Sequence, residues 1–217
     1  MEYVFTPEQE DFRVRVQQFI SENWTPPPAH AHPGDDETTD ADRVYEKRLA
    51  EHGWLTMAWP KEYGGLGASH MEQLIFREES AYAGAPGGGG QGITMVGPCL
   101  MVHGRDEQQQ EHLPRIANAE VMWAQGFSEP GSGSDLASLQ TRAVRDGDDF
   151  VINGQKIWTS SAHHADWLHI LTRTDPDAPK HRGISYFLLD LKTPGITIRP
   201  LINMLGDHEF NEPSSRM

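Results

Sequence analysis

Two short segments combine residue types that can hydrogen-bond to a ligand and stack against it. The first, GFSEPGSGSD at residues 126–135, mixes hydroxyl side chains with glycines, whose backbone a ligand can approach closely. The second, NGQKIWTS at residues 153–160, places an indole ring beside two hydroxyl groups. Taken alone, the first segment is more typical of an ordinary Gly/Ser loop, and Trp158 is more typical of a core residue.

Other kinds of site are not favoured by the residue spacing. The run GSGSDL is not a dinucleotide-binding fingerprint, because its sixth position is Leu136 and no βαβ pattern surrounds it. His163 and His164 are adjacent, so that on a strand they would point to opposite faces. His30 and His32 fall in a polar loop, where we expect them to be solvated. We therefore predict no metal site.

The composition indicates a folded protein that does not bind nucleic acid. With 18 basic and 32 acidic side chains the net charge is −14, which disfavours nucleic acids and anionic membranes as partners. Any bound phosphate must then be held by local groups. The single cysteine, Cys99, lies in an apolar run and is expected to be buried, and it excludes an internal disulfide framework. We predict a cytoplasmic protein with no membrane span.

The first half of the sequence has helical periodicity. Thr6, Pro7 and Gln9 predict a helix start with a capping box, and apolar residues follow at helical spacing. A second capping box at Ser69 opens another helix. We expect helices from Thr6, at about 40–52, from Ser69 through Ala81, at 93–103 and at 106–119, with a surface loop at 24–38.

From about Met122 the sequence changes to short runs that are typical of strands. A turn is predicted at Asp146-Gly147, and Asn153-Gly154 between apolar residues gives the strongest hairpin signal. Further strands are predicted at 167–173, 183–191 and 196–201. The fold class is therefore α+β, with an all-α domain at 1–120 followed by a small antiparallel β-barrel domain at 121–217.

Together, the two segments resemble the signature of the acyl-CoA dehydrogenases. In that family a (T/S)EPGxGSD loop is followed by an NGxKxW(I/T)(T/S) hairpin. The run WPKEYGGLG at 59–67 and the helix from Gly104 to Pro114 match the family as well. The resemblance extends from Thr6 to about Asn211, nearly the whole sequence.

The resemblance implies a flavin enzyme of fatty acid metabolism, an oxidoreductase with FAD as its cofactor. In this family a carboxylate base removes the α proton of an acyl-CoA thioester while a hydride leaves Cβ for N5 of FAD. An apolar wall, donors at the flavin edge and a close backbone are needed, and the matching positions are Phe127, Ser128, Gly133, Ser134, Trp158, Thr159 and Ser160. The serine at position 134 is implied to lie at the acyl-CoA or flavin phosphate end.

The sequence departs from the family pattern at its C-terminal end. Family members continue into a third, helical domain, which carries the catalytic glutamate and much of the subunit interface. Here Glu212 is followed by a polar run at 213–217. Truncation, a frameshift and deliberate shortening all remain open. Glu129 belongs to the loop motif, so no residue is predicted to be the base, and we expect these residues alone to be inactive or weakly active.

The resemblance also implies partners, and it leaves alternative functions open. We expect an acyl-CoA substrate, an electron-transferring flavoprotein as acceptor, and a homo-oligomer in the full-length form. An acyl-CoA oxidase or a flavin monooxygenase on the same fold is the alternative among enzymes. A non-catalytic remnant or partner subunit is the alternative from another class.

Overall fold

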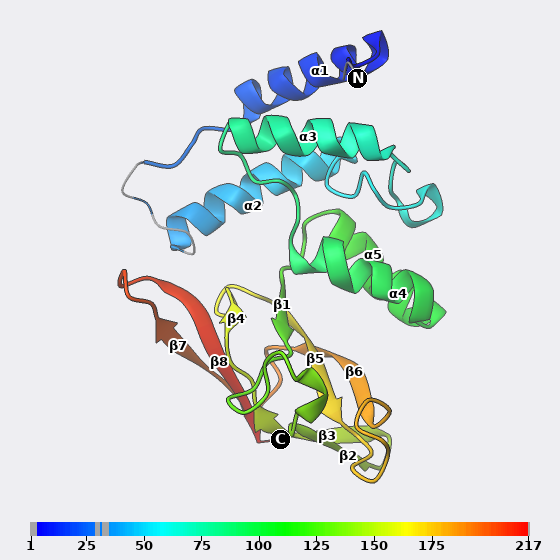
Figure 1. Cartoon of the computed structure of the whole chain (residues 1–217), viewed down its shortest axis with the longest axis vertical. Helices are drawn as coiled ribbons and strands as arrows, with labels where there is room; N and C mark the ends of the chain where they lie inside the picture. Colours follow the sequence, from blue (N-terminus) through cyan, green and yellow to red (C-terminus); the bar gives the residue numbers. More distant parts are fainter. Residues whose placement is uncertain (1–3, 29–30, 32–34, 217) are drawn as a thin grey trace. The chain divides into compact units, whose positions relative to one another are not determined.

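The computed structural model describes residues 4–28, 31 and 35–216, so His30, His32 and part of the expected loop at 24–38 lie outside the described residues. Contacts among Cα atoms separate two compact units, with the change between Glu120 and Val121. The first unit is helical and the second consists mainly of strands (Figure 1).

Helix α1 (Pro7–Asn23) begins where the sequence predicts. The Thr6 hydroxyl accepts a hydrogen bond from the backbone N–H of Gln9, and the Gln9 side chain accepts one from the backbone N–H of Thr6, which completes a capping box. The buried face consists of the residues predicted from the helical period, Phe12, Val16, Phe19 and Ile20.

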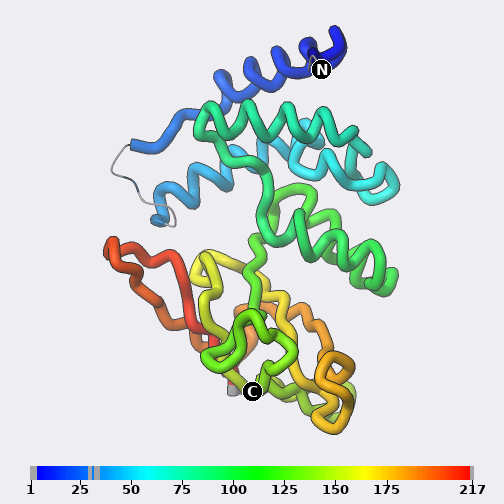
Figure 2. Tube along the Cα trace, in the orientation of Figure 1, coloured from blue at the N-terminus to red at the C-terminus, as the bar shows by residue number. Residues whose placement is uncertain are grey.

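Helix α2 (Asp36–Glu51) begins earlier than the predicted residue 40. Its first turn holds Asp36 and Glu37, whose negative charges are favourable at a helix N-terminus. Neither residue is apolar, so the pattern of apolar residues that predicts a helix does not reach this turn. The third helix, α3 (His70–Tyr82), opens with the predicted capping box between Ser69 and Glu72. Helices α1 and α3 lie side by side (Figure 2).

The remaining helical segments are short. A 3₁₀ turn (Lys61–Tyr63) precedes α3, and a π-helical turn (Gly92–Val96) leads directly into α4 (Gly97–His103), followed by α5 (Asp106–Ala117). Cys99 lies on α4 and is half-buried rather than buried, and burial raises the pKa of its thiol. Among the described residues, no helix has both the length and the apolar character needed to cross a bilayer.

The second unit contains one mixed sheet of eight strands that is nearly closed. The strands are β1 (Trp123–Gly126), β2 (Arg142–Asp146), β3 (Asp149–Gln155), β4 (Thr159–Ser160), β5 (Trp167–Arg173), β6 (Ile184–Asp190), β7 (Ile196–Ile202) and β8 (His208–Arg216). The order is β1-β5-β2-β3-β8-β4, with β6 paired to β5 and β7 to β8. The ends of this order, β1 and β4, also contact each other. A 3₁₀ turn, Leu136–Ser138, follows β1.

The sequence predicts an antiparallel barrel, but the sheet contains both parallel and antiparallel pairs. Strands β1 and β2 pair with β5 in parallel, while the other pairs are antiparallel. The apolar core inside the sheet consists of Ala124, Ala162, Leu168 and Ile170. This barrel-like unit positions both of the segments predicted to form the site.

The hairpin prediction at Asn153-Gly154 is wrong, whereas the turn at Gly147 is confirmed. Gly147 has a φ of 64° and connects β2 to β3. Asn153 and Gly154 lie within β3, where Gly154 pairs with Ser215. A Cβ at Gly154 would lie 2.4 Å from the hydroxyl of Thr141, so this glycine permits a close approach rather than a turn.

Candidate functional site

The structure holds the two predicted segments next to each other. The backbone N–H of Ile157 donates to the carbonyl of Ser128 at 2.9 Å, and Lys156 Nζ donates to the carbonyl of Phe127 at 3.1 Å. The loop after β1 therefore runs beside the residues that lead into β4. These bonds place Phe127 and Ser128 close in space to the residues before Trp158.

A buried ion pair joins the same two segments. Lys156 Nζ lies 2.8 Å from Oε1 of Glu129, which also accepts the backbone N–H of Thr141 at 2.9 Å. The other oxygen, Oε2, accepts the backbone N–H of Gln140 at 2.6 Å. Burial raises the pKa of Glu129, but these hydrogen bonds outweigh burial and hold the pKa below its usual value. Glu129 is thus a fixed carboxylate with a structural task.

The glycines of the loop border open space. Glu129 and Ser132 exchange two backbone hydrogen bonds of 2.8 and 3.0 Å, which fold residues 129–132 into a tight turn. A Cβ at Gly131 or Gly133 would meet no atom within 4 Å. Ser134 follows with an exposed side chain. This side of the loop can therefore accept a ligand close to its backbone.

Trp158 is exposed and is therefore not a core residue, although its residue type taken alone is more typical of one. Its side chain is 62% exposed, and its ring meets the ring of Phe210 edge-on, with centroids 6.0 Å apart. The backbone of Trp158 is left-handed, with a φ of 59°. A bulky residue in this conformation is uncommon and often marks a functional position.

The two hydroxyl residues after Trp158 differ in their surroundings. Ser160 is exposed. Thr159 is only 1% exposed, and its Oγ1 has no hydrogen-bond partner within the described part of the chain. The carbonyl of Thr159 accepts a bond of 3.2 Å from Asn211, and β4 pairs with β8 at Asn211 and Phe210. Only Ser160 therefore presents its hydroxyl to solvent here.

Family models match both units of the chain. The N-terminal domain of acyl-CoA dehydrogenases matches residues 6–120, and the middle domain matches residues 124–213. The chain belongs to the acyl-CoA dehydrogenase family. The structural similarity agrees, since the ChsE4-ChsE5 complex from Mycobacterium tuberculosis superposes on the whole chain with a TM-score of 0.86 and 40% identity, covering 55% of that chain.

Other relatives lie within the same family. Acyl-CoA dehydrogenase IpdE1 of Mycobacterium tuberculosis is 42% identical over 209 residues, covering 94% of this chain and 54% of the relative. A structure described as the Tcur3481-Tcur3483 steroid ACAD matches with a TM-score of 0.84 and 36% identity. The match covers the whole of this chain and 56% of the chain in that structure. This chain spans about half the length of the relatives that it matches.

The side chains around Trp158 suit a flavin, which this family employs. A planar ring needs an apolar surface, and the exposed indole offers one. Its polar edge needs hydrogen-bond donors, which the exposed Ser160 hydroxyl and the amides along the glycine loop can provide. The arrangement therefore fits the cofactor.

Three histidines, His163, His164 and His208, lie together near this site, whereas the sequence predicts that His163 and His164 point to opposite faces of a strand. His163 and His164 lie in a turn rather than a strand, and their ring centroids are 3.9 Å apart. His208 stacks on His163 at 3.7 Å, and Asn211 contacts both of these rings. Stacked rings direct their nitrogens outward, and the described residues contain no group suited to a metal ion.

Phe127 covers a buried histidine. The ring of His169 on β5 lies 5.1 Å from that of Phe127 and 5.6 Å from that of Tyr186. His169 has no exposed surface, and neither ring nitrogen has a hydrogen-bond partner among the residues that the structure describes. Burial lowers its pKa to about 4. Phe127 is only half-buried, so one part of its ring remains accessible.

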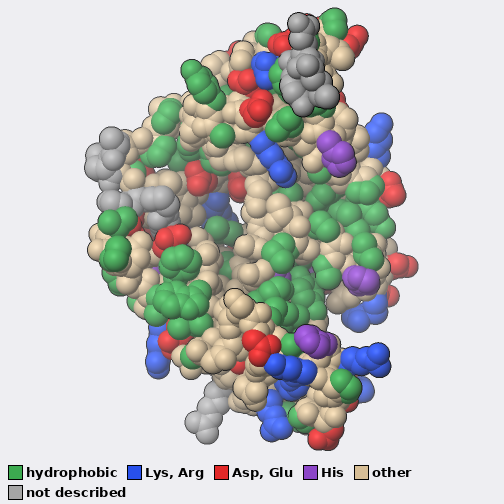
Figure 3. Space-filling model, viewed as in Figure 1, with side chains coloured by type: hydrophobic (Ala, Val, Ile, Leu, Met, Phe, Trp, Pro, Cys, Tyr) green, Lys and Arg blue, Asp and Glu red, His purple; other side chains and the backbone are tan. Residues whose placement is uncertain are grey.

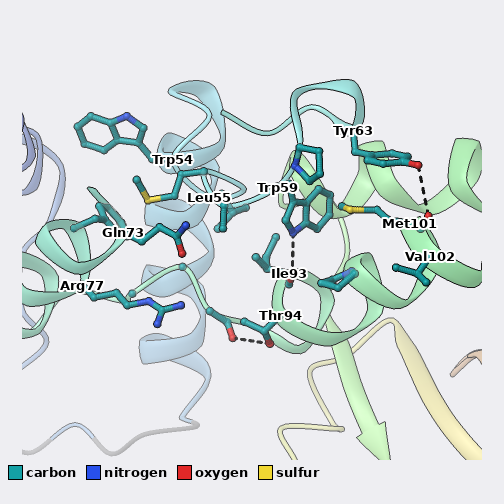
Figure 4. Close-up of a pocket in the computed structure, with 18 residues that line it drawn as sticks. Trp54, Leu55, Trp59, Tyr63, Gln73, Arg77, Ile93, Thr94, Met101 and Val102 are labelled. Carbon is teal, nitrogen blue, oxygen red and sulfur yellow. Dashed lines mark hydrogen bonds between the residues drawn. The ribbon is translucent and has the colours of Figure 1, made fainter. Parts of the chain in front are cut away.

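The helical unit of the chain contains an apolar cavity of about 930 Å³ (Figure 4). The indole of Trp59 forms one wall and donates to the carbonyl of Ile93 at 3.0 Å. A Cβ at Gly97 would lie 2.2 Å from the Trp59 ring, so this glycine makes room for the indole. Gln73 and Arg77 of α3 add polar groups. Sequence reasoning missed this cavity, because its walls come from four separate segments.

Proposed function

We propose that this chain is the flavin-binding part of an acyl-CoA dehydrogenase, which desaturates an acyl-CoA thioester with FAD as cofactor. Family membership supports this assignment, as does one observation above all. The glycine-rich loop and the segment bearing Trp158 lie together, fastened by Lys156, in one unit.

In this proposal FAD, when bound, supplies the hydride acceptor. Trp158 and Phe127 form the apolar wall, and Ser128 and Ser160 belong to the polar edge. Gly133 allows close approach of the backbone, and Ser134 contacts a phosphate of acyl-CoA or of the flavin. Since Thr159 is buried, it contributes by holding the backbone of β4 through Asn211.

The base that removes the α proton is proposed to lie outside these 217 residues. Glu129 is the carboxylate of the loop motif, and its two oxygens already accept three hydrogen bonds. A carboxylate with a lowered pKa and this many donors is a poor proton acceptor. The 217 residues alone should therefore bind flavin but not complete the reaction.

We further propose that the protein acts in the cytoplasm, within an oligomer of acyl-CoA dehydrogenase chains, and passes its electrons to an electron-transferring flavoprotein. Two similar structures are named for paired components, ChsE4-ChsE5 and Tcur3481-Tcur3483. The second is described as a steroid enzyme, and the cavity of about 930 Å³ has the size of a ligand pocket. We therefore propose a bulky apolar acyl group.

Flavin binding is the first experiment. Titration of the protein with FAD, followed by flavin fluorescence, should show saturable binding, and Trp158→Ala should weaken it about fivefold or more. Phe150→Ala is the matched control, because Phe150 is also exposed and meets one ring, that of Phe187, edge-on. Equal affinities for FAD in both variants would contradict the placement.

Turnover is the second experiment. The 217-residue protein is mixed with FAD, a panel of acyl-CoAs and an artificial electron acceptor, and no steady turnover is expected, because a missing base costs about 10²–10⁴ in rate. Rapid turnover would place the base within these residues. In the assembled enzyme, reoxidation by an electron-transferring flavoprotein rather than by oxygen would separate a dehydrogenase from an oxidase.

A further inference from the structure

One buried amide connects β4 to the histidines near it. The side chain of Asn211 on β8 has no exposed surface. Its Nδ2 donates to the carbonyl of Thr159 at 3.2 Å and to Nδ1 of His163 at 3.0 Å, and its Oδ1 lies 2.7 Å from Nε2 of His208. Both polar atoms of this amide therefore have partners, as is usual for a buried polar group.

These contacts fix where two of the histidines carry a proton. A backbone carbonyl can only accept, so the atom of Asn211 that faces the carbonyl of Thr159 must be the amide nitrogen. Nδ1 of His163 meets the same nitrogen and must therefore accept, which requires an unprotonated Nδ1 and a neutral ring. The amide oxygen can only accept, so Nε2 of His208 must carry a proton.

A proton on Nδ1 of His163 would break this arrangement. It would place an N–H group against the N–H of Asn211, and a reversed amide would instead set its oxygen against the carbonyl of Thr159. The charged ring would also stack on His208 at 3.7 Å and lie 3.9 Å from the ring of His164. The titratable residues of the two segments that meet here, 161–166 and 207–211, are His163, His164, Asp166, Asp207, His208 and Glu209.

The amide of Asn211 lies beside the exposed apolar part of the site. Figure 3 shows hydrophobic side chains gathered over the β7–β8 hairpin, where Ile202 and Leu205 are exposed. Trp158 directly precedes Thr159 and is exposed as well. A change in the bond from Asn211 to β4 would therefore displace the indole and the hydroxyl of Ser160 together.

We propose that Asn211 is a positioning residue of the candidate flavin site, which holds β4 for cofactor binding only while Nδ1 of His163 is unprotonated. The proposal rests on the proposed function, because that function makes β4 part of the flavin site. Asn211 acts through the carbonyl of Thr159 rather than by touching the ligand. Histidine changes its charge between about pH 5 and 8, so FAD affinity should fall as the pH drops through this range.

The first measurement needs no flavin. Nitrogen NMR of the imidazole rings at about pH 8 should show an unprotonated Nδ1 in His163, and the backbone amide signals of Thr159 and Ser160 should move as the pH falls to about 5.5. His163→Asn should abolish this movement, because its amide oxygen can accept the same bond but does not titrate. His208→Gln is the matched control, because its amide keeps the donor of Nε2, and the movement should remain.

Flavin binding then tests the role of Asn211 in the site. In the unchanged 217-residue protein, FAD affinity should fall about fivefold from pH 8 to pH 5.5, as expected for one lost hydrogen bond. Asn211→Asp should show the opposite trend, because its carboxylate cannot donate to Thr159 at pH 8 but can accept from a protonated His163 at about pH 5.5. Asn153→Asp makes the same change at an exposed position of β3 and should keep the trend of the unchanged protein.

Each outcome decides the assignment. A protonated Nδ1 of His163 at about pH 8, or movement of the β4 signals that persists in His163→Asn, overturns it. The same trend in Asn211→Asp as in the unchanged protein also overturns it. If Asn211→Asp does not fold, the comparison of His163→Asn with His208→Gln still decides. If the β4 signals respond as expected but FAD does not bind, the proton-dependent hold on β4 stands and the flavin proposal fails.

Discussion

Lys156 Nζ and Glu129 Oε1 lie 2.8 Å apart, and both side chains are almost completely buried. One partner belongs to the glycine-rich loop and the other to the segment that leads to Trp158. The pair therefore fixes the relative position of the two segments of the candidate flavin site. Burial lowers the pKa of Lys156, while the carboxylate of Glu129 opposes this shift and favours the charged ammonium.

Removal of Lys156 should be costly for the fold. In Lys156→Met the carboxylate of Glu129 stays buried without its cation, so the free energy of unfolding should fall by about 3–5 kcal/mol. The double variant Lys156→Met with Glu129→Gln should lose less, because no buried charge remains. Urea unfolding of the three proteins measures both values. A double variant as unstable as Lys156→Met would refute this account.

Lys180 provides the comparison for that experiment. It forms an ion pair with Asp135, but the two side chains are 49% and 64% exposed. Lys180→Met should therefore change the free energy of unfolding by less than about 1 kcal/mol.

The buried His169 predicts a pH dependence. Its folded pKa of about 4 lies below the usual value of 6.5, so the unfolded chain binds more protons between these values. The free energy of unfolding should therefore fall as the pH drops from 6.5 towards 4, by up to about 3 kcal/mol. In His169→Phe this part of the slope should vanish. Glu129 adds a loss only below its usual value of 4.5.

Urea unfolding at several pH values measures this slope. His181→Gln serves as the control, because His181 is also a histidine but is exposed in the loop between β5 and β6. An unaltered slope in His169→Phe would show that other groups cause the pH dependence.

The left-handed backbone of Trp158 predicts an unusual order of stabilities. At a φ of 59° a Cβ costs about 1 kcal/mol, so Trp158→Gly should be more stable than Trp158→Ala by about that amount. Phe150, whose φ is not in the left-handed region, should show the reverse order, because glycine weakens an ordinary strand. Thermal unfolding without flavin compares the four variants. The same order at both positions would argue against strain at Trp158.

The unpaired hydroxyl of Thr159 predicts a stabilising substitution. Thr159→Val keeps the shape but removes a buried polar group without a partner, so the free energy of unfolding should rise by about 1 kcal/mol. Thr174→Val is the opposite case, because its hydroxyl lies 2.7 Å from that of Ser185, and it should be destabilising. Urea unfolding checks both. A loss of stability in Thr159→Val would show that the hydroxyl has an unseen partner, such as water.

Local signals in the sequence predicted most of the helical unit, since each is complete within a few residues. The capping boxes at Thr6 and Ser69 and the apolar period after Thr6 needed no distant partner to be recognised. At Asn153-Gly154 the local signal was misleading. The pair is a good turn sequence, but the close approach of Thr141 and the pairing with β8 hold it in a strand.

Long-range pairing explains the other misses. Strand β8 has the polar sequence HEFNEPSSR and lacks the alternation typical of a half-buried strand, so only its partners identify it. The parallel pairing of β1 with β5 likewise depends on residues some forty positions apart. At the site, the motif residues could be named from sequence, whereas the exposure of Trp158 and the burial of Thr159 follow from how β4 pairs with β8.

Strand β8 is the shared neighbour of β3, β4 and β7. Transient release of this one strand would therefore uncover unpaired backbone groups on three strands at once, including the pair that carries Thr159 and Ser160. Such an opening would expose edges that can template association with another molecule, and it would loosen the candidate flavin site in the same event. Aggregation and loss of cofactor affinity should thus share a single origin in this protein.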